Sequence, residues 1–405
     1  YPDINHEVTW GADYVFHQFS PGSITARSGD TTFDTGTSEL NYSHEAAVYA
    51  QDSYDVTDRL KINFGLRYSY FAQVGPFIRY SPNESSNGVG SISETEVTKY
   101  QKGDLIQTYG GFEPRASLRY SVGRSASVKA GYSRNLQYIH LASLSPTSLP
   151  TDVWIPSSEI VRPQIGTQYN IGYFNNFGTN SKWESSIEMY YKNMSGLVEY
   201  QEGAQPEDNV NDNIDNNLEF GTGTSYGTEL FIKKVNGTVT GWVGYTLSKT
   251  ERVFENINGG NAFPAKFDRR HDLSIVCSWQ VHAKWKLGAA FVYATGNAIT
   301  LPLERYFFEG QIVDVYGERN SFRMAPYHRA DLSATFTPKS ESNRSSKTGV
   351  HSFWTFSIYN VYNRMNPYFI YLGNEGSLER GTFEEKAYQV SLFPILPSIT
   401  WNFSL

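Results

Sequence analysis

A two-residue alternation in residues 60–70 constrains the fold of this chain more than any other feature. Apolar and aromatic side chains occupy every second position from Leu60 to Tyr70, and the positions between them include Lys61, Asn63 and Arg67. Successive side chains of a β-strand point to opposite faces, so this alternation predicts a strand. One face of that strand needs an apolar surrounding, and the other needs water or a polar partner.

The same alternation recurs about fourteen times along the 405 residues, and we find no stretch with helical periodicity long enough to predict a helix. No apolar run approaches the roughly 18 residues of a spanning helix. The sequence therefore predicts an all-β fold. The expected strands are 5–19, 43–56, 60–74, 111–122, 126–138, 164–177, 182–195, 223–235, 238–249, 267–281, 283–296, 326–338, 350–363 and 387–404.

The connections between these strands alternate between short and long. The short ones read as hairpin turns, and the long ones fall on every second connection, hence at one end of the sheet. An outer-membrane barrel has this asymmetry, with short periplasmic turns and long extracellular loops. The polar connection 339–349 is a longer exception on the short side. The long connections are 20–42, 75–110, 139–163, 196–222, 250–266, 297–325 and 364–386.

The composition fits one sheet with an apolar face and a wet face. The chain holds 29 Tyr, 25 Phe and 8 Trp, yet its mean hydropathy is −0.46. Aromatic residues at strand ends are typical of the two interfacial girdles of a membrane barrel. A soluble propeller would show a repeat near 40–50 residues, and none is present. The sequence therefore predicts a transmembrane antiparallel β-barrel, with a soluble β fold as the alternative.

Charge and cysteine content add two weaker indications. The net charge of −7 gives no reason to expect nucleic acid as a partner, because phosphate binding needs a basic surface. The single cysteine, Cys277, allows no intrachain disulfide.

Several stretches together resemble one family. "HEAAVYAQDSYDVTDRLKINFGLRYSYF" (44–71) and "FEPRASLRYSV…SVKAGYSRNLQY" (112–138) look like hairpins of TonB-dependent outer-membrane transporters, and "FDRRHDLS" (267–274) and "SIYNVYNRMNPY" (357–368) look like later strands of that family. The early "WGADYVFHQFSPG" and the central "LPTDVWIPSSEIVRPQIGTQYNIGYF" are similar to its Bacteroidota branch. The resemblance extends over nearly the whole chain.

The resemblance implies a 22-stranded barrel that is preceded by a plug domain and a short TonB-binding segment, the TonB box. This sequence supplies about fourteen strands and neither of those parts. We therefore expect residues 1–405 to be the C-terminal part of the barrel, with the plug and first strands missing from this chain.

For function, the resemblance implies energised import of a nutrient across the outer membrane of a Gram-negative bacterium. The expected partners are outer-membrane lipid, a plug domain of the same precursor, the TonB system, and a surface lipoprotein or other envelope proteins. Two alternatives stay open: a stand-alone 14-stranded passive channel, and a barrel that acts as a scaffold in a surface complex. We expect no enzymatic activity, cofactor or metal site, because we find no catalytic set and no metal-ligand spacing among the eight histidines.

Two groups of residues are candidates for the functional site. Loop 139–163 carries four prolines, which lower the cost of holding a loop still, and we expect it to form a lid with ligand contacts at His140, Trp154 and Ile155. Charged side chains on polar strand faces are expected to face the lumen, where they either pair within the wall or dock the plug. These are Lys61, Arg67, Arg115, Arg119, Arg134, Glu184 and Glu188.

Overall fold

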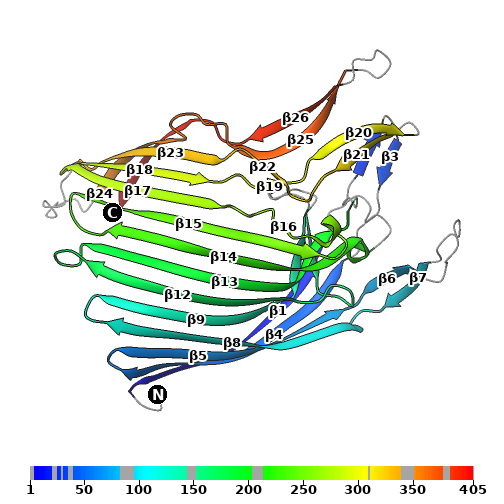
Figure 1. Cartoon of the computed structure of the whole chain (residues 1–405), viewed down its shortest axis with the longest axis horizontal. Coiled ribbons are helices and arrows are strands. Elements are labelled where there is room, and N and C mark those ends of the chain that lie inside the picture. Colours follow the sequence, from blue (N-terminus) through cyan, green and yellow to red (C-terminus); the bar gives the residue numbers. More distant parts are fainter. Residues whose placement is uncertain are drawn as a thin grey trace.

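The protein folds into one large, curved antiparallel sheet, seen in a computed structural model (Figure 1). The structure describes residues 4–20, 25–28, 31–34, 40–82, 95–143, 152–202, 213–308, 311–338, 351–376 and 384–404. Fourteen strands lie side by side in the order β1-β4-β5-β8-β9-β12-β13-β14-β15-β17-β18-β23-β24-β27, and β16 pairs with β15 off this path. The all-β prediction is confirmed.

The strand bounds agree closely with the alternation in the sequence, and the expected spans 60–74 and 164–177 match β5 and β12 at both ends. The fourteen strands are β1 (His6–Phe19), β4 (Asn41–Thr57), β5 (Leu60–Val74), β8 (Leu105–Val122), β9 (Ala126–Gln137), β12 (Gln164–Phe177), β13 (Trp183–Tyr200), β14 (Leu218–Lys234), β15 (Val239–Phe254), β17 (His271–His282), β18 (Trp285–Ala294), β23 (Tyr327–Phe336), β24 (His351–Tyr359) and β27 (Leu396–Ser404).

Short turns connect the strands at one end of the sheet, at the left of Figure 1, and long excursions leave the other end. These excursions are not the structureless loops that the sequence suggested, because most of them contain paired strands of their own. They hold β2 (Thr25–Ser28), β3 (Thr31–Asp34), β6 (Phe77–Pro82), β7 (Thr95–Tyr100), β10 (Ile139–Ala142), β11 (Val153–Pro156), β16 (Phe263–Pro264), β19 (Ala298–Ile299), β20 (Pro302–Phe308), β21 (Gln311–Tyr316), β22 (Phe322–Arg323), β25 (Pro367–Glu375) and β26 (Glu384–Ser391). The connection 339–349 lies outside the described residues.

The last expected strand, 387–404, is wrong as a single element. Residues up to Ser391 belong to β26, which pairs with β25 in an excursion, and the sheet strand β27 begins only at Leu396. Pro394 lies in the connection between the two strands and Pro397 is the second residue of β27, where the switch of apolar parity at "LFPILP" predicts a bulge or bend. A proline lacks the N–H that a continuous ladder requires, which explains the break.

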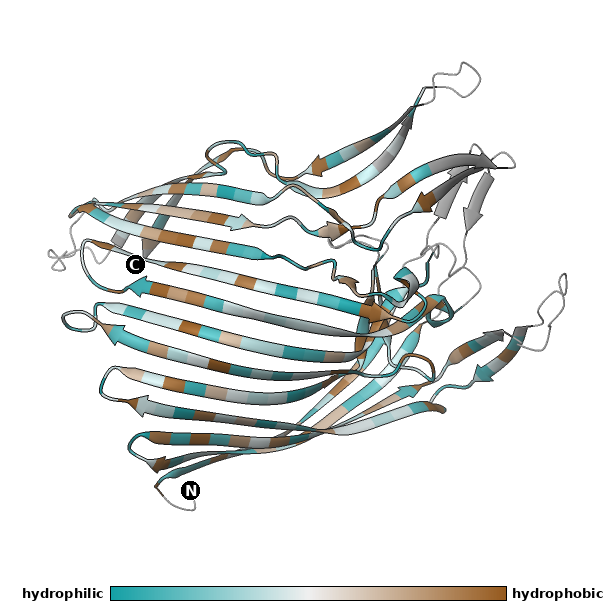
Figure 2. Cartoon of the chain, in the orientation of Figure 1, coloured by the Kyte–Doolittle hydropathy of each residue, from teal (hydrophilic) through white to brown (hydrophobic). Residues whose placement is uncertain are grey.

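Hydrophobic and hydrophilic residues alternate along the strands (Figure 2), so the two faces of the sheet carry different side chains. On β5, Phe64 and Leu66 are about half exposed on the convex face, whereas Phe71 on the concave face is fully buried. Trp401 is also exposed on the convex face, where its ring stacks on that of Trp354 at 5.7 Å between centroids. Exposed aromatic and aliphatic residues of this kind have no place on a water-facing surface of this extent, so the convex face suits lipid.

Two edges of the sheet stay unpaired. Within the described residues, neither β1 nor β27 has a second strand neighbour, and the two do not pair with each other. The described part of the chain also has no helix long and apolar enough to cross a bilayer. Its helical turns are the short 3-10 segments η2 (Ile214–Asn217) and η3 (Asn258–Gly260).

Candidate functional site

The concave wall carries a row of cations across three neighbouring strands. Lys61 of β5 lies directly opposite Arg119 of β8, which lies opposite Lys129 of β9. Like charges placed directly opposite each other destabilise a sheet, so this row needs an anionic counterpart or water. Lys129 Nζ also lies 3.9 Å from the centre of the Phe174 ring, which stabilises its charge locally.

This row lines a hollow of about 840 Å³ on the concave face. The predicted lumen residues Lys61, Arg67, Arg115 and Arg119 all line it. The buried Glu113 lies 3.9 Å from Arg67 Nε, so one cation has a carboxylate neighbour within the wall. Asp55 of β4, the register partner of Lys61, lies 3.5 Å from Lys61 Nζ, so two of the predicted lumen cations have carboxylate neighbours within the wall.

Glu184 and Glu188 lie on the same concave face, further round the sheet. Glu188 is opposite Gly172, two positions from Asn170, which lines the hollow. Glu184 accepts a 3.2 Å contact from Lys233 of β14, and both side chains are well exposed. An exposed pair of this kind contributes little to stability.

The register of β9 corrects the prediction for Arg134. This residue follows Lys129 by five positions in a continuous register, so the two side chains lie on opposite faces. The Arg134 guanidinium donates at 3.1 Å to the backbone carbonyl of Phe112, near the point where β8 and β9 stop pairing. The alternation itself contained this answer, because an odd spacing changes the face.

The three predicted loop residues meet in the β10–β11 hairpin. His140 pairs with Ile155, and Leu141 pairs with Trp154. His140 and Ile155 are both buried, whereas Trp154 is 55% exposed. His140 Nε2 lies 3.0 Å from the Ser157 hydroxyl, and burial lowers the His140 pKa to about 4. Of the three, only Trp154 has an exposed side chain.

The β10–β11 hairpin lies over the concave side of the sheet. β11 contacts β1 and β4, and β10 contacts β13, although four or more strands separate these partners. The fully buried Val161 and Tyr200 form an apolar cluster with residues of the hairpin. The loop is therefore packed in place across the mouth of the sheet.

A buried polar junction ties three excursions together beneath this hairpin. Arg79 of the β6–β7 hairpin donates to Asp215 of η2 at 2.7 Å, and both side chains are buried. The Ser158 hydroxyl donates to the same carboxylate at 2.7 Å, and Asn213 bonds the backbone of Tyr80. Three segments that are far apart in sequence thus share one polar core.

A second junction centres on Glu199, whose carboxylate is inaccessible to solvent. Arg252 contacts one oxygen at 3.1 Å, and Lys266 and Arg319 contact the other at 2.8 and 3.0 Å. Lys266 also donates to the Ser143 carbonyl. Burial lowers the Lys266 pKa, and the Glu199 charge opposes that shift. One carboxylate therefore fastens β15, the segment after β16 and the turn before β22.

A bulge in β13 aims Glu199 inward. The register shifts between Ser195 and Leu197, so the concave face passes from even to odd positions. Gly196 at the bulge has φ +69°, and a Cβ there would lie 2.6 Å from the Pro163 carbonyl oxygen. Only glycine fits this conformation without strain.

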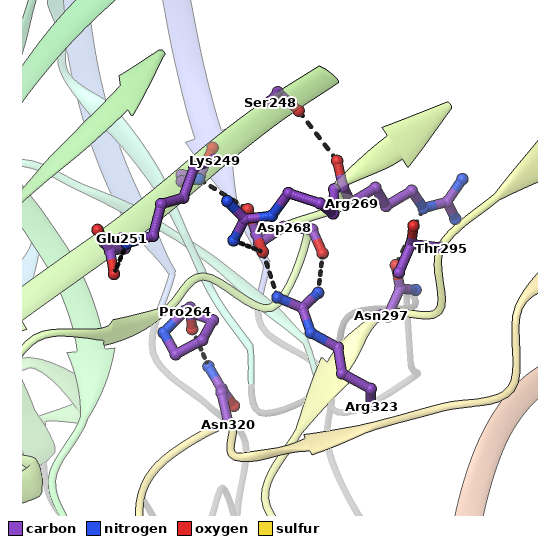
Figure 3. Close-up of polar contacts among 12 residues, drawn as sticks. Ser248, Lys249, Glu251, Pro264, Asp268, Arg269, Thr295, Asn297, Asn320 and Arg323 are labelled. Carbon is purple, nitrogen blue, oxygen red and sulfur yellow. Dashed lines mark hydrogen bonds and ion pairs between the residues drawn. The ribbon is translucent and has the colours of Figure 1, made fainter. Parts of the chain in front are cut away.

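A third junction surrounds Asp268 (Figure 3). The Arg323 guanidinium donates to the Asp268 carboxylate and to its backbone carbonyl, and the Thr250 N–H donates to the same carboxylate at 2.7 Å. Asn320 donates to the Pro264 carbonyl at 2.9 Å beside it. The segment 263–270 is thereby fixed against the excursion that contains β19 and β22.

Sequence reasoning missed all three junctions. Their members come from excursions whose partners no local pattern reveals, although Ser158 and Asp268 lie in stretches on which the family resemblance rests. The described residues hold no cluster of His, Cys, Asp or Glu suited to a metal. Three aspartates of the acidic loop 196–222 have the oxygen ligands that a metal could use: Asp208 and Asp212 lie outside the described residues, and Asp215 pairs with Arg79.

The sequence matches the family described as "TonB dependent receptor-like, beta-barrel" over residues 2–363. The chain belongs to this family. A comparison with curated proteins finds no match.

Solved structures with the same fold include three receptors of low sequence identity. The ferric-catecholate import receptor Fiu from Escherichia coli K12 is 13% identical, with a TM-score of 0.55, and the ferric yersiniabactin uptake receptor FyuA from Yersinia pestis is 11% identical, with a TM-score of 0.60. The FrpB iron transporter from Neisseria meningitidis is 10% identical, with a TM-score of 0.57. The match covers 98%, 98% and 99% of this chain but 52%, 51% and 53% of those chains. The chain thus spans about half the length of these structures.

Proposed function

We propose that this chain forms the C-terminal wall and the extracellular loops of a TonB-dependent receptor that imports a nutrient across the outer membrane of a Gram-negative bacterium. The match to the receptor barrel family over residues 2–363 carries this proposal. The fixed hairpin over the concave side supports it, because a capture site needs ordered groups at the mouth of the barrel.

In this proposal, a plug domain docks against the row of Lys61, Arg119 and Lys129. Asp55 of β4 lies opposite Lys61, but Arg119 and Lys129 have no carboxylate as a register partner on either side. A plug segment with acidic side chains would supply a negative charge to these two cations. The two unpaired edges would join the remaining strands of a 22-stranded barrel, since a sheet in lipid must close. The unpaired edges count against the stand-alone 14-stranded channel.

Transport is tested by uptake into cells that depend on the full-length protein. The probes are radiolabelled iron(III)–catecholate and copper, together with a panel of labelled oligosaccharides. We expect uptake of one probe class to stop when a protonophore is added or when TonB is deleted. Uptake that persists under both conditions would establish a passive channel. A protein that imports no probe but co-purifies with envelope proteins would favour the scaffold alternative.

Docking of the plug is tested by reversing charge in the row. We expect R119E/K129E to weaken plug retention, seen as faster proteolysis of the plug in the full-length protein, and we expect added salt to weaken retention in the wild type. K286E is the matched control, because Lys286 lies on the same concave face away from the hollow. Equal rates of plug proteolysis in the wild type and both variants would show that the plug does not dock at this row.

A further inference from the structure

Three histidines on the sheet share one arrangement. In each, the imidazole Nδ1 lies within hydrogen-bond distance of a tyrosine hydroxyl on the neighbouring strand or just after it. The pairs are Tyr14–His44 at 2.8 Å, Tyr245–His271 at 2.8 Å and Tyr362–His328 at 2.9 Å. They are spread along the sheet, at β1/β4, β15/β17 and β23/β24.

All three histidines lie on the convex face. His44 alternates in register with Val48, His271 with Leu273 and Ile275, and His328 with Leu332. This is the face that carries the exposed apolar side chains. In the proposed function, on which this inference rests, that face contacts lipid.

The pairs lie at one level of the presumed bilayer. Each histidine is among the first four residues of a strand that runs away from the long excursions. On β17, the stretch from His271 to the exposed Trp279 spans eight residues, which is about 26 Å along the strand and about 20 Å along the axis of a tilted barrel. That length is close to the apolar band of roughly 25 Å. The three pairs therefore mark its extracellular edge, at the level of lipid headgroups.

Their partners set these histidines apart from two others. His6 Nδ1 lies 2.7 Å from Asp52, and His17 Nε2 lies 3.2 Å from Glu45, so a carboxylate can neutralise either ring. The histidines of the three Tyr–His pairs have a neutral hydroxyl instead.

Each pair also keeps one unused hydrogen-bond donor. If the tyrosine hydroxyl donates to Nδ1, the ring carries its proton on Nε2; if Nδ1–H donates, the hydroxyl proton remains. Among the described residues, no acceptor is seen for that donor. A donor at the edge of the hydrocarbon needs an acceptor.

We propose that the three Tyr–His pairs bind the phosphate groups of outer-leaflet lipid headgroups. A phosphate supplies strong anionic acceptors at the level where the pairs lie. The exposed Arg269, two residues before His271, adds a permanent cation at the central pair.

The test compares two triple variants of the full-length protein in phosphatidylcholine vesicles that contain spin-labelled phosphatidic acid or spin-labelled phosphatidylcholine. Electron paramagnetic resonance measures how strongly each label associates with the protein. At pH 6 we expect the wild type to favour phosphatidic acid roughly threefold. We expect H44F/H271F/H328F to show almost no preference.

The variant Y14F/Y245F/Y362F distinguishes lipid binding from a purely structural role, in which the Tyr–His hydrogen bonds only link neighbouring strands. It breaks the same hydrogen bonds but keeps the imidazoles, so we expect it to retain at least part of the preference for phosphatidic acid. A preference that is absent in the wild type, or unchanged in the histidine triple, overturns the proposal. Thermal unfolding verifies that both variants fold. Nutrient uptake, measured in parallel, tests the proposed function separately, because neither triple alters the concave face.

Discussion

At the scale of single residues, the Glu199 carboxylate forms ion pairs with three cations. Removing it in E199A would leave Lys266, Arg252 and Arg319 without their shared carboxylate in a buried place. Breaking a buried ion pair in this way costs about 3–5 kcal/mol. We expect a clear fall in the thermal unfolding temperature. E184A on the same strand is the control and should cost less than about 1 kcal/mol, because the Glu184–Lys233 pair is exposed. Equal losses in both variants would show that the junction adds nothing.

His140 makes the β10–β11 hairpin sensitive to acid. Its pKa is about 4 in the folded protein, below the ordinary 6.5, because burial disfavours the charged ring. The unfolded loop therefore takes up a proton before the folded loop does, and stability falls as the pH drops from about 6.5 to 4, by at most about 3 kcal/mol. The protection factors of the β10 and β11 amides, which are corrected for the intrinsic pH dependence of exchange, should fall over this range in the wild type. In H140Q the exchange should depend on pH no more than that of the neighbouring strands.

The same residues show how far a sequence can specify a site. The parity of β5 and β8 predicted that Lys61 and Arg119 share the concave face, because alternation is local. His140 was chosen for its chemistry, and nothing nearby in the sequence indicated that Ser157 and the loop core would bury it. Arg252 and Arg319 meet Glu199 across 53 and 120 residues of chain. Such long-range contacts depend on how the excursions pack against one another. The two-residue periodicity of the sequence carries no information about that packing.

At the scale of elements, the bulge at Gly196 shifts the register of β13 and thereby places Glu199 on the concave face. In G196A the added Cβ would lie 2.6 Å from the Pro163 carbonyl oxygen, in a backbone conformation that alanine adopts poorly. We expect a loss of about 1–3 kcal/mol in unfolding free energy. G244A is the matched control, because the nearest atom to its Cβ would be 3.5 Å away and its φ is ordinary. The proposed role of the bulge fails if G196A unfolds at the temperature of G244A.

The strands of the sheet were predictable, whereas the excursions were not. A strand exposed to lipid on one face and to polar groups on the other must alternate strictly, so its bounds can be read directly. The β6–β7 hairpin and the segment after β11 are linked through Asp215, and the burial of such excursions depends on tertiary contacts. From the sequence we therefore predicted only long connections there. We also predicted one strand in place of β26 and β27, because apolar and polar residues alternate in both segments.

At the scale of the whole molecule, the pairing of the two edge strands, β1 and β27, distinguishes part of a larger barrel from a closed 14-stranded barrel. A 14-stranded channel would bring β1 against β27, whereas a larger barrel would keep them apart. We expect no disulfide between A12C and I399C, or between W10C and W401C, in a C277S background of the full-length protein under oxidation. T355C/T400C is the positive control, because these residues are register partners on β24 and β27. A disulfide between β1 and β27 in membranes, with the control also linked, would establish the closed 14-stranded channel and exclude the larger barrel.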